Sequence, residues 1–148
     1  MHSFTHLIKL APSTTLLPLY GVNIPAGFPS PAQDFIEPSL SLDELMSIRA
    51  PHVYLMRVSG MSMRDAGIME DDILVVDRAT PALPGDVVVA SYNNDQIVKM
   101  LEVCDGEIVA LRSANPEYPD IVPQEGDVVE IWGVVTSSVR LHRRSLPC

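Results

Sequence analysis

Six short runs rich in valine, isoleucine and leucine lie between Val53 and Val135, and they constrain the fold more than any other feature. The runs read VYLMRV, DILVVD, GDVVVASY, QIVKMLEV, EIVALRS and DVVEIWGVV. Turn-forming stretches such as MEDD, PALPGD, NND and CDGE separate them. β-Branched side chains favour strands, and connections this short join neighbouring antiparallel strands. We therefore expect a mostly β fold, compact and antiparallel.

The first forty residues differ in character from the rest. Six of the thirteen prolines fall within residues 1–40. Proline lacks a backbone donor and restricts the residue before it, so we expect this stretch to resist regular structure. We interpret 1–40 as an extended N-terminal arm and 41–148 as the folded domain.

One short helix is predicted at SLDELMSIR, immediately after the arm. Ser41 is followed three residues later by Glu44, which is the pattern of a capping box. Leu42, Leu45 and Ile48 then recur at helical spacing.

The charge and cysteine content narrow the function classes. A formal net charge of -9 argues against extensive direct contact with nucleic acid, because phosphate binding requires clustered lysines and arginines. We therefore expect no direct sequence-specific DNA binding. Cys104 and Cys148 are far apart and form neither a metal-ligand spacing nor a disulfide framework, which fits a reducing compartment.

We expect a cytoplasmic protein that does not enter a membrane. The apolar start MHSFTHLIKLAPSTTLLPLYGV is interrupted by Lys9, Pro12 and Pro18, and it lacks the pattern of a signal peptide. No window reaches the eighteen or so uninterrupted apolar residues of a membrane helix.

The segment RVSGMSMRDAGIMEDDILVVD places Ser62 between two methionines in a turn that contains glycine. This arrangement would present one hydroxyl inside an apolar cleft, where it could act as a nucleophile if a base lay nearby. The alternative is a hydroxyl satisfied by the backbone of its own turn, which is common.

The candidate base is Lys99 in QIVKMLEV, which shares a strand face with Ile97, Leu101 and Val103. Burial there would lower the pKa of the amine and make it available as a neutral general base. The alternative is a lysine whose ammonium reaches the surface from an edge strand. The histidines suggest no triad, and no paired His or Cys residues suggest a metal site or a cofactor.

Together these motifs resemble a known family. SGMSM (Ser59–Met63), followed by GIMEDDILVVD, GDVVVA and VKML, resembles the catalytic core of the LexA/UmuD self-cleaving Ser-Lys proteases, peptidase family S24. The 37-residue separation of Ser62 and Lys99 also matches that family. The short arm with AGFPSPAQDFIE resembles the UmuD-like SOS mutagenesis proteins, because it leaves no room for the helix-turn-helix domain of the repressors. The likeness runs from about Gly27 to Val135.

The resemblance implies a role for individual residues. Ser62 would be the nucleophile, Lys99 the general base, and the backbone amides of Met61 and Ser62 the oxyanion hole. The scissile bond would be Ala26–Gly27. UmuD-like proteins are best known with cysteine before that glycine, so Ala26 is a departure, although another small side chain should fit the same pocket.

The resemblance also implies partners and a function. Self-cleavage would be stimulated by the RecA filament on single-stranded DNA, and the processed homodimer would serve a UmuC-like Y-family DNA polymerase in error-prone translesion synthesis. Two alternatives stay open. One is a catalytically inactive binding module that regulates a polymerase. The other is a signal-peptidase-like Ser-Lys protease, which would need an N-terminal membrane anchor.

Overall fold

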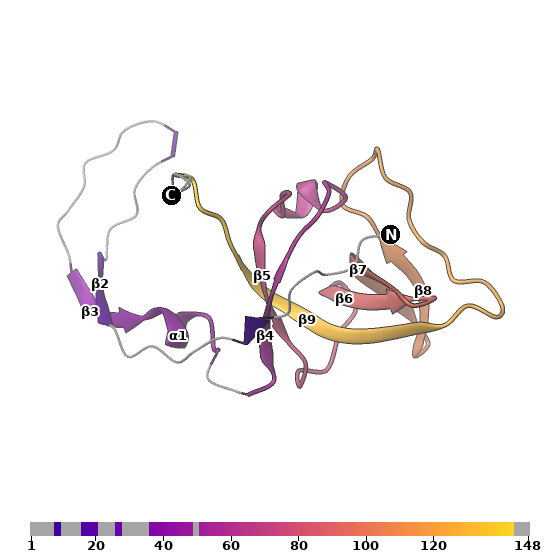
Figure 1. Ribbon diagram of the computed structural model, residues 1–148, viewed down its shortest axis with the longest axis horizontal. Coiled ribbons are helices and arrows are strands. Elements are labelled where there is room, and N and C mark those ends of the chain that lie inside the picture. The colour runs from indigo at the N-terminus through magenta and orange to yellow at the C-terminus, as the bar shows by residue number, and fades with distance from the viewer. Residues whose placement is uncertain (1–7, 10–15, 21–25, 28–35, 49–50, 144–148) are drawn as a thin grey trace. The chain divides into compact units, whose positions relative to one another are not determined.

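The computed structural model describes residues 8–9, 16–20, 26–27, 36–48 and 51–143 (Figure 1). The chain divides into two compact units. The larger unit combines Met1–Leu10 with Pro51–Cys148, and the smaller unit is Ala11–Ala50.

One antiparallel sheet of seven strands makes up the larger unit. Its strands in chain order are β1 (Ile8–Lys9), β4 (Val53–Arg57), β5 (Ile73–Asp77), β6 (Val87–Tyr92), β7 (Asp95–Cys104), β8 (Glu107–Arg112) and β9 (Val129–Val139). They lie in the order β1-β4-β5-β9-β6-β7-β8, and every neighbouring pair is antiparallel. All six apolar runs of the sequence therefore form strands, and the expected mostly β fold is confirmed.

The long strand β9 joins the two halves of this sheet (Figure 1). Its first part pairs with β6 and its second part with β5, so that Val134 is opposite both Val88 and Asp77. The register shifts in each pairing near this point, as expected where bulges bend a sheet. Gly133 lies beside the register shift with β6, and a Cβ atom there would be 2.6 Å from Cγ1 of Val76.

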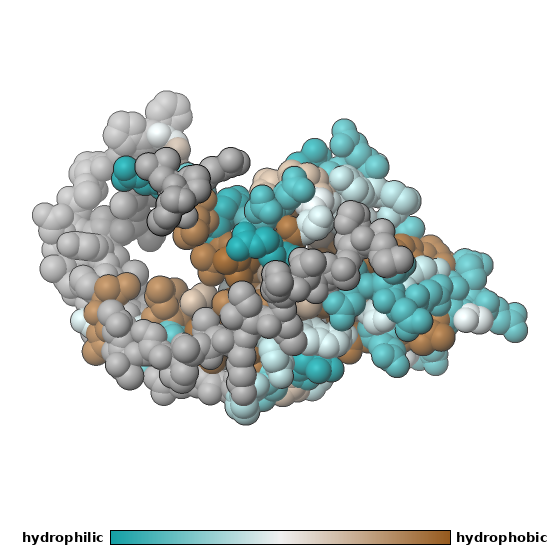
Figure 2. Space-filling view, viewed as in Figure 1, coloured by the Kyte–Doolittle hydropathy of each residue, from teal (hydrophilic) through white to brown (hydrophobic). Residues whose placement is uncertain are grey.

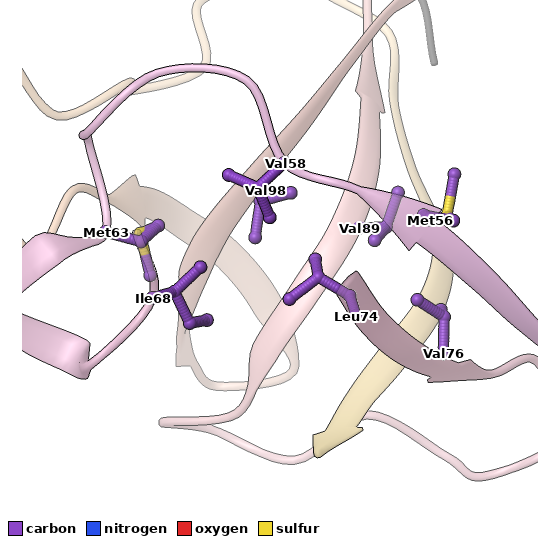
Figure 3. Close-up of a cluster of buried hydrophobic side chains, with 8 residues drawn as sticks. All are labelled: Met56, Val58, Met63, Ile68, Leu74, Val76, Val89 and Val98. Carbon is purple, nitrogen blue, oxygen red and sulfur yellow. The ribbon is translucent and has the colours of Figure 1, made fainter. Parts of the chain in front are cut away.

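Hydrophobic side chains cover both faces of the central strands. One core cluster consists of Met56, Val58, Met63, Ile68, Leu74, Val76, Val89 and Val98 (Figure 3). A second cluster consists of Val88, Ala90, Leu101, Leu111 and Val134. Successive residues of β6 alternate between the two clusters, which explains why its sequence is an almost unbroken run of valine and alanine.

The visible surface over β6, β7 and β8 is largely hydrophilic, with hydrophobic side chains scattered within it (Figure 2). Among the described residues, no helix is both long enough and apolar enough to cross a bilayer.

The smaller unit contains a strand pair that the sequence analysis did not anticipate. β2 (Leu16–Tyr20) and β3 (Ile36–Ser41) pair in antiparallel orientation. The register shifts between Leu17 and Leu19, so Pro18 lies at an irregularity of the ladder. A proline is tolerated at such an irregularity because its missing N–H is not needed for the ladder. The expectation that residues 1–40 resist regular structure is wrong for β2 and β3.

The predicted helix is present and short. α1 (Leu42–Leu45) follows Ser41, whose hydroxyl accepts a hydrogen bond from the Asp43 N–H at 3.2 Å. Ser47 has φ 53°, a left-handed conformation that ends the helix before the predicted SLDELMSIR segment is complete.

Candidate active site

The loop that carries Ser62 follows β4 and leads into a short 3-10 helix, η1 (Arg64–Ala66). Gly60 turns the chain with φ +88°, a conformation that costs glycine little. Met63 is 2% exposed and anchors the loop in the first core cluster (Figure 3), whereas Ser62 is half-buried. The fold thus buries the residue after the serine and leaves the serine at the edge of the core.

A segment far along the chain fixes the shape of this loop. The Ala114 N–H donates to the Ser62 carbonyl at 2.8 Å, and the Asp65 N–H donates to the Ala114 carbonyl at 2.7 Å. The side-chain amide of Asn115 donates to the Met61 carbonyl at 2.8 Å. Asn115 was not among the residues predicted from the sequence, although the Asn-Pro pair in SANPEY is typical of an ordered turn.

The loop leaves two adjacent backbone donors unused. Within the described part of the chain, neither the Met61 N–H nor the Ser62 N–H has a hydrogen-bond acceptor. Two neighbouring amides that are free in this way can receive a negatively charged oxygen. These are the same two amides that the sequence resemblance suggested.

Lys99 lies in the interior of the sheet. It stands opposite Val88, in a strand with β6 on one side and β8 on the other. Only 8% of the residue is exposed, and Ile97 and Leu101 on the same strand face pack in the second core cluster. The alternative of a lysine reaching solvent from an edge strand is therefore wrong.

Burial lowers the pKa of the Lys99 amine, and the nearby charge of Asp120 opposes that effect only in part. Among the described residues, the amine has neither a hydrogen bond nor an ion pair. A desolvated amine without a partner favours its neutral form, which can accept a proton.

Two arrangements bring the Ser62 loop and Lys99 into the same region of the sheet. First, Val98 precedes Lys99 and packs in the same core cluster as Met63, the residue after Ser62 (Figure 3). Val98 and Lys99 point to opposite faces of β7, so the backbone at Lys99, and not its side chain, lies beside this cluster. No hydrogen bond joins the Ser62 and Lys99 side chains within the described residues.

The second arrangement involves the chain that follows β8. Met100 pairs with Arg112 across β7 and β8, so Lys99 lies beside the chain that leads from Arg112 to Ala114. Ala114 in turn binds the Ser62 carbonyl. The same short segment therefore adjoins both the candidate base and the candidate nucleophile.

The acidic group near Lys99 is itself held by cationic and backbone donors. Asp120 accepts hydrogen bonds from the Arg112 guanidinium at 2.9 Å and from the Ser113 N–H at 2.8 Å. Arg112 also forms an ion pair with Glu102. An open pocket of about 490 Å³ lies beside this segment, lined by Asp65, Ser113, Ala114, Asn115, Pro116, Tyr118, Pro119 and Asp120.

The predicted cleavage site belongs to the smaller unit. Ala26 and Gly27 lie in a bend, and both residues are exposed. A Cβ atom at Gly27 would meet nothing within 4 Å. Across the described ranges, no group of three or more His, Cys, Asp or Glu side chains is placed to hold a metal ion.

Comparison with known proteins gives a consistent result. The sequence pattern of the family described as Peptidase S24-like matches residues 18–136. Protein MucA from Escherichia coli is 40% identical over 127 residues, which cover 85% of this chain and 86% of MucA. Protein SamA from Salmonella typhimurium strain LT2 is 36% identical over 132 residues, which cover 89% of this chain and 91% of SamA. The LexA repressor from Bordetella avium is 38% identical over 130 residues, covering 88% of this chain and 60% of the repressor.

Proposed function

The chain belongs to the Peptidase S24-like family, and from that premise we propose that it is a Ser-Lys peptidase that cuts its own chain between Ala26 and Gly27. Ser62 is the nucleophile and Lys99 the general base. Residues 1–40 form the arm that contains the scissile bond, and residues 41–148 form the domain that cleaves it.

The reaction begins when the neutral Lys99 amine takes the proton of the Ser62 hydroxyl. The serine oxygen then attacks the carbonyl carbon of Ala26, and the tetrahedral intermediate carries a negative oxygen. As the peptide bond breaks, the Lys99 ammonium returns its proton to the leaving amine of Gly27. Water, activated by Lys99, then hydrolyses the ester between Ser62 and Ala26 and frees the enzyme.

The Met61 and Ser62 amides stabilise the negative oxygen. This assignment is supported by their lack of any other acceptor among the described residues. Removal of one such donor in other proteases lowers turnover by about 10²–10³-fold. Small side chains at Ala26 and Gly27 allow an extended segment to enter a narrow site, and both are exposed in the structure.

The burial of Lys99 is the observation that carries this proposal. A lysine that is 8% exposed, with its pKa lowered and no ion-pair partner among the described residues, is expensive for stability. Perturbed groups of this kind concentrate at functional sites. Lys99 follows Ser62 by 37 positions, and Ser62 lies in a loop that is anchored in the core. Because the chain belongs to a peptidase family, Lys99 is well suited to be the general base.

The similarity to MucA and SamA supports a role of the UmuD type in SOS mutagenesis. We propose that the RecA filament on single-stranded DNA stimulates cleavage by favouring the conformation in which the arm occupies the site. The processed protein, a cytoplasmic homodimer, then serves a UmuC-like Y-family polymerase as an accessory subunit. The net charge of -9 suits a protein that reaches DNA through protein partners.

Intact-mass spectrometry of the purified chain, incubated between pH 7 and 10 without any partner, tests the chemistry. Raising the pH should deprotonate Lys99 and yield a fragment that begins at Gly27. Ser62→Ala and Lys99→Ala are the controls, and neither should produce this fragment.

Each outcome has a distinct meaning. A fragment with another N-terminus would refute the Ala26–Gly27 assignment but not the Ser-Lys chemistry. Equal cleavage in the Ser62→Ala control would refute the nucleophile. Cleavage that is absent at every pH, and also absent with RecA filaments, would favour the inactive polymerase-regulating module.

A further inference from the structure

We propose that Asn115 is a positioning residue that orients the oxyanion-binding amide of Ser62. This inference rests on the proposed function and adds to it a residue outside the Ser-Lys pair. Asn115 is 5% exposed, and its side chain spans from the loop after β8 to the loop that carries Ser62.

The side chain of Asn115 is fixed at both ends. Its Oδ1 accepts a hydrogen bond from the Glu117 N–H at 3.0 Å, and its Nδ2 donates to the Met61 carbonyl at 2.8 Å. A backbone N–H can only donate and a carbonyl can only accept, so these two partners determine which end of the amide faces each of them. The NH₂ group of Asn115 is therefore directed at Met61.

Holding the Met61 carbonyl also holds the Ser62 N–H. Both groups belong to one planar peptide unit, and in a trans peptide they point in opposite directions. The Asn115 amide binds the oxygen on one side, which directs the Ser62 N–H to the other side. That N–H has no acceptor among the described residues.

The other bonds in this region cannot replace Asn115. The Arg64 N–H also reaches the Met61 carbonyl, but at 3.2 Å and from within the same turn, so it moves with the loop. The Ala114 N–H binds the Ser62 carbonyl, which belongs to the next peptide unit. Among the described side chains, Asn115 alone ties the Met61–Ser62 peptide to the body of the sheet.

Asn115→Asp is the sharpest test, because it removes one donor and preserves the shape of the residue. The carboxylate can still accept the Glu117 N–H, but it faces the Met61 carbonyl with an oxygen in place of an NH₂ group. Asn115→Ala is the second variant and adds no charge. The control is Asn94→Asp, which makes the same change at an exposed turn position where φ is +72°.

The readout is the rate of fragment formation across pH 7 to 10, measured beside the thermal unfolding of each variant. We expect the rate at the plateau to fall about 100-fold in Asn115→Asp and about 10-fold or more in Asn115→Ala. The midpoint of the pH profile should stay unchanged in Asn115→Ala, because this variant adds no charge near Lys99 and the lysine keeps its buried environment. Asn94→Asp should cleave like the parent chain.

The possible outcomes distinguish a failure of the Asn115 role from a failure of the Ser-Lys mechanism. If the parent chain cleaves and both folded Asn115 variants cleave at its rate, the positioning role is refuted and the Ser-Lys mechanism stands. A midpoint that moves to higher pH in the uncharged variant Asn115→Ala would also refute it, because Asn115 would then act on the pKa of Lys99. If the parent chain does not cleave at Gly27 at all, both proposals fail together.

Discussion

Arg140 and Asp72 form a bidentate ion pair that joins the end of β9 to the turn before β5. The guanidinium Nε is 2.7 Å from Oδ1 of Asp72, and Nη2 is 2.6 Å from Oδ2. Nη2 also donates to the Gly67 carbonyl, and the Met69 N–H donates to the same carboxylate. Asp72 is only 1% exposed, so its charge depends on these partners.

Replacement of Arg140 by alanine should therefore destabilise the fold. The carboxylate of Asp72 would remain buried with most of its compensation removed. We expect the free energy of unfolding to fall, by less than for a fully buried pair because the Arg140 side chain is 38% exposed. Urea unfolding at pH 7 measures this loss. The control is Arg57→Ala, which removes an exposed guanidinium that makes one hydrogen bond, 3.3 Å long, to the Asp71 carbonyl. If Arg57→Ala lowered the free energy of unfolding as much as Arg140→Ala, the burial of Asp72 would not explain the effect.

The same pair predicts how stability depends on pH. The hydrogen bonds from Arg140 lower the pKa of Asp72 below its ordinary value near 3.9. The ionised carboxylate thus contributes its full stabilisation above that value, and the contribution is lost as the pH falls through the lower folded pKa. Asp72→Asn should be much less stable than the parent chain at neutral pH, and the difference should shrink in strong acid. A constant difference from pH 7 to pH 2 would refute this account.

The burial of Lys99 predicts a gain in stability when the amine is removed. Its folded pKa is lowered, so the unfolded chain holds this proton more tightly than the folded chain does. Lys99→Met keeps the volume of the side chain and removes the charge, and it should raise the free energy of unfolding by about 0.5–2 kcal/mol at pH 7. The gain should diminish as rising pH neutralises Lys99 in the folded parent chain.

The matched comparison for this gain is Ser62→Ala, which should also block cleavage by the proposed mechanism but leaves the charge of Lys99 in place. If Ser62→Ala gained as much stability as Lys99→Met, the effect would come from the loss of cleavage and not from the buried charge. Differential scanning calorimetry at several pH values distinguishes these two explanations.

The strands were predictable because their signal is local. Each apolar run is short, β-branched and bounded by turn residues, so pattern alone located β4 to β9. The double pairing of β9 has no local signal, because it depends on two other strands, β5 and β6, that are distant in the sequence. The β2–β3 pair was missed for a related reason. Pro18 opposes strand formation locally, whereas the shifted register between Leu17 and Leu19 accommodates it.

Some residues of the candidate site could likewise be predicted from local sequence, and others could not. The candidate serine and lysine could be chosen from residue type, strand periodicity and the family resemblance, and the structure bears out the burial of Lys99. Asn115 could not be found like this, because its partner Met61 is 54 positions away and the bond depends on how two loops meet. Local sequence patterns indicate which side chains could take part in a reaction. Contacts between distant segments determine how those side chains and the backbone amides are oriented.

Gly133 predicts a steric cost for the smallest possible addition. A Cβ atom there would be 2.6 Å from Cγ1 of Val76 and 3.1 Å from the carbonyl oxygen of Asp77. Val76 is completely buried in the core and the Asp77 oxygen belongs to the backbone, so Gly133→Ala should lower the free energy of unfolding by about 1–3 kcal/mol. Chemical unfolding in a Ser62→Ala background measures this cost without cleavage. Gly27→Ala, where a Cβ atom meets nothing within 4 Å, is the control and should change stability by less than about 0.5 kcal/mol.

In the proposed mechanism, the charge of Asp120 should influence the pH at which self-cleavage begins. Asp120 favours the ammonium form of Lys99 and so acts against the lowering of the Lys99 pKa by burial. Asp120→Asn removes that charge, and the Lys99 pKa should therefore fall further. A larger fraction of the chain then holds a neutral base at a given pH, so the midpoint of the cleavage profile should move to lower pH and the rate at pH 7 should rise. Asp105→Asn, at an exposed turn with φ 51°, provides a matched change of charge and should leave the midpoint where it is. A midpoint that rises in Asp120→Asn would mean that the carboxylate serves cleavage through the position of Arg112 and not through its charge.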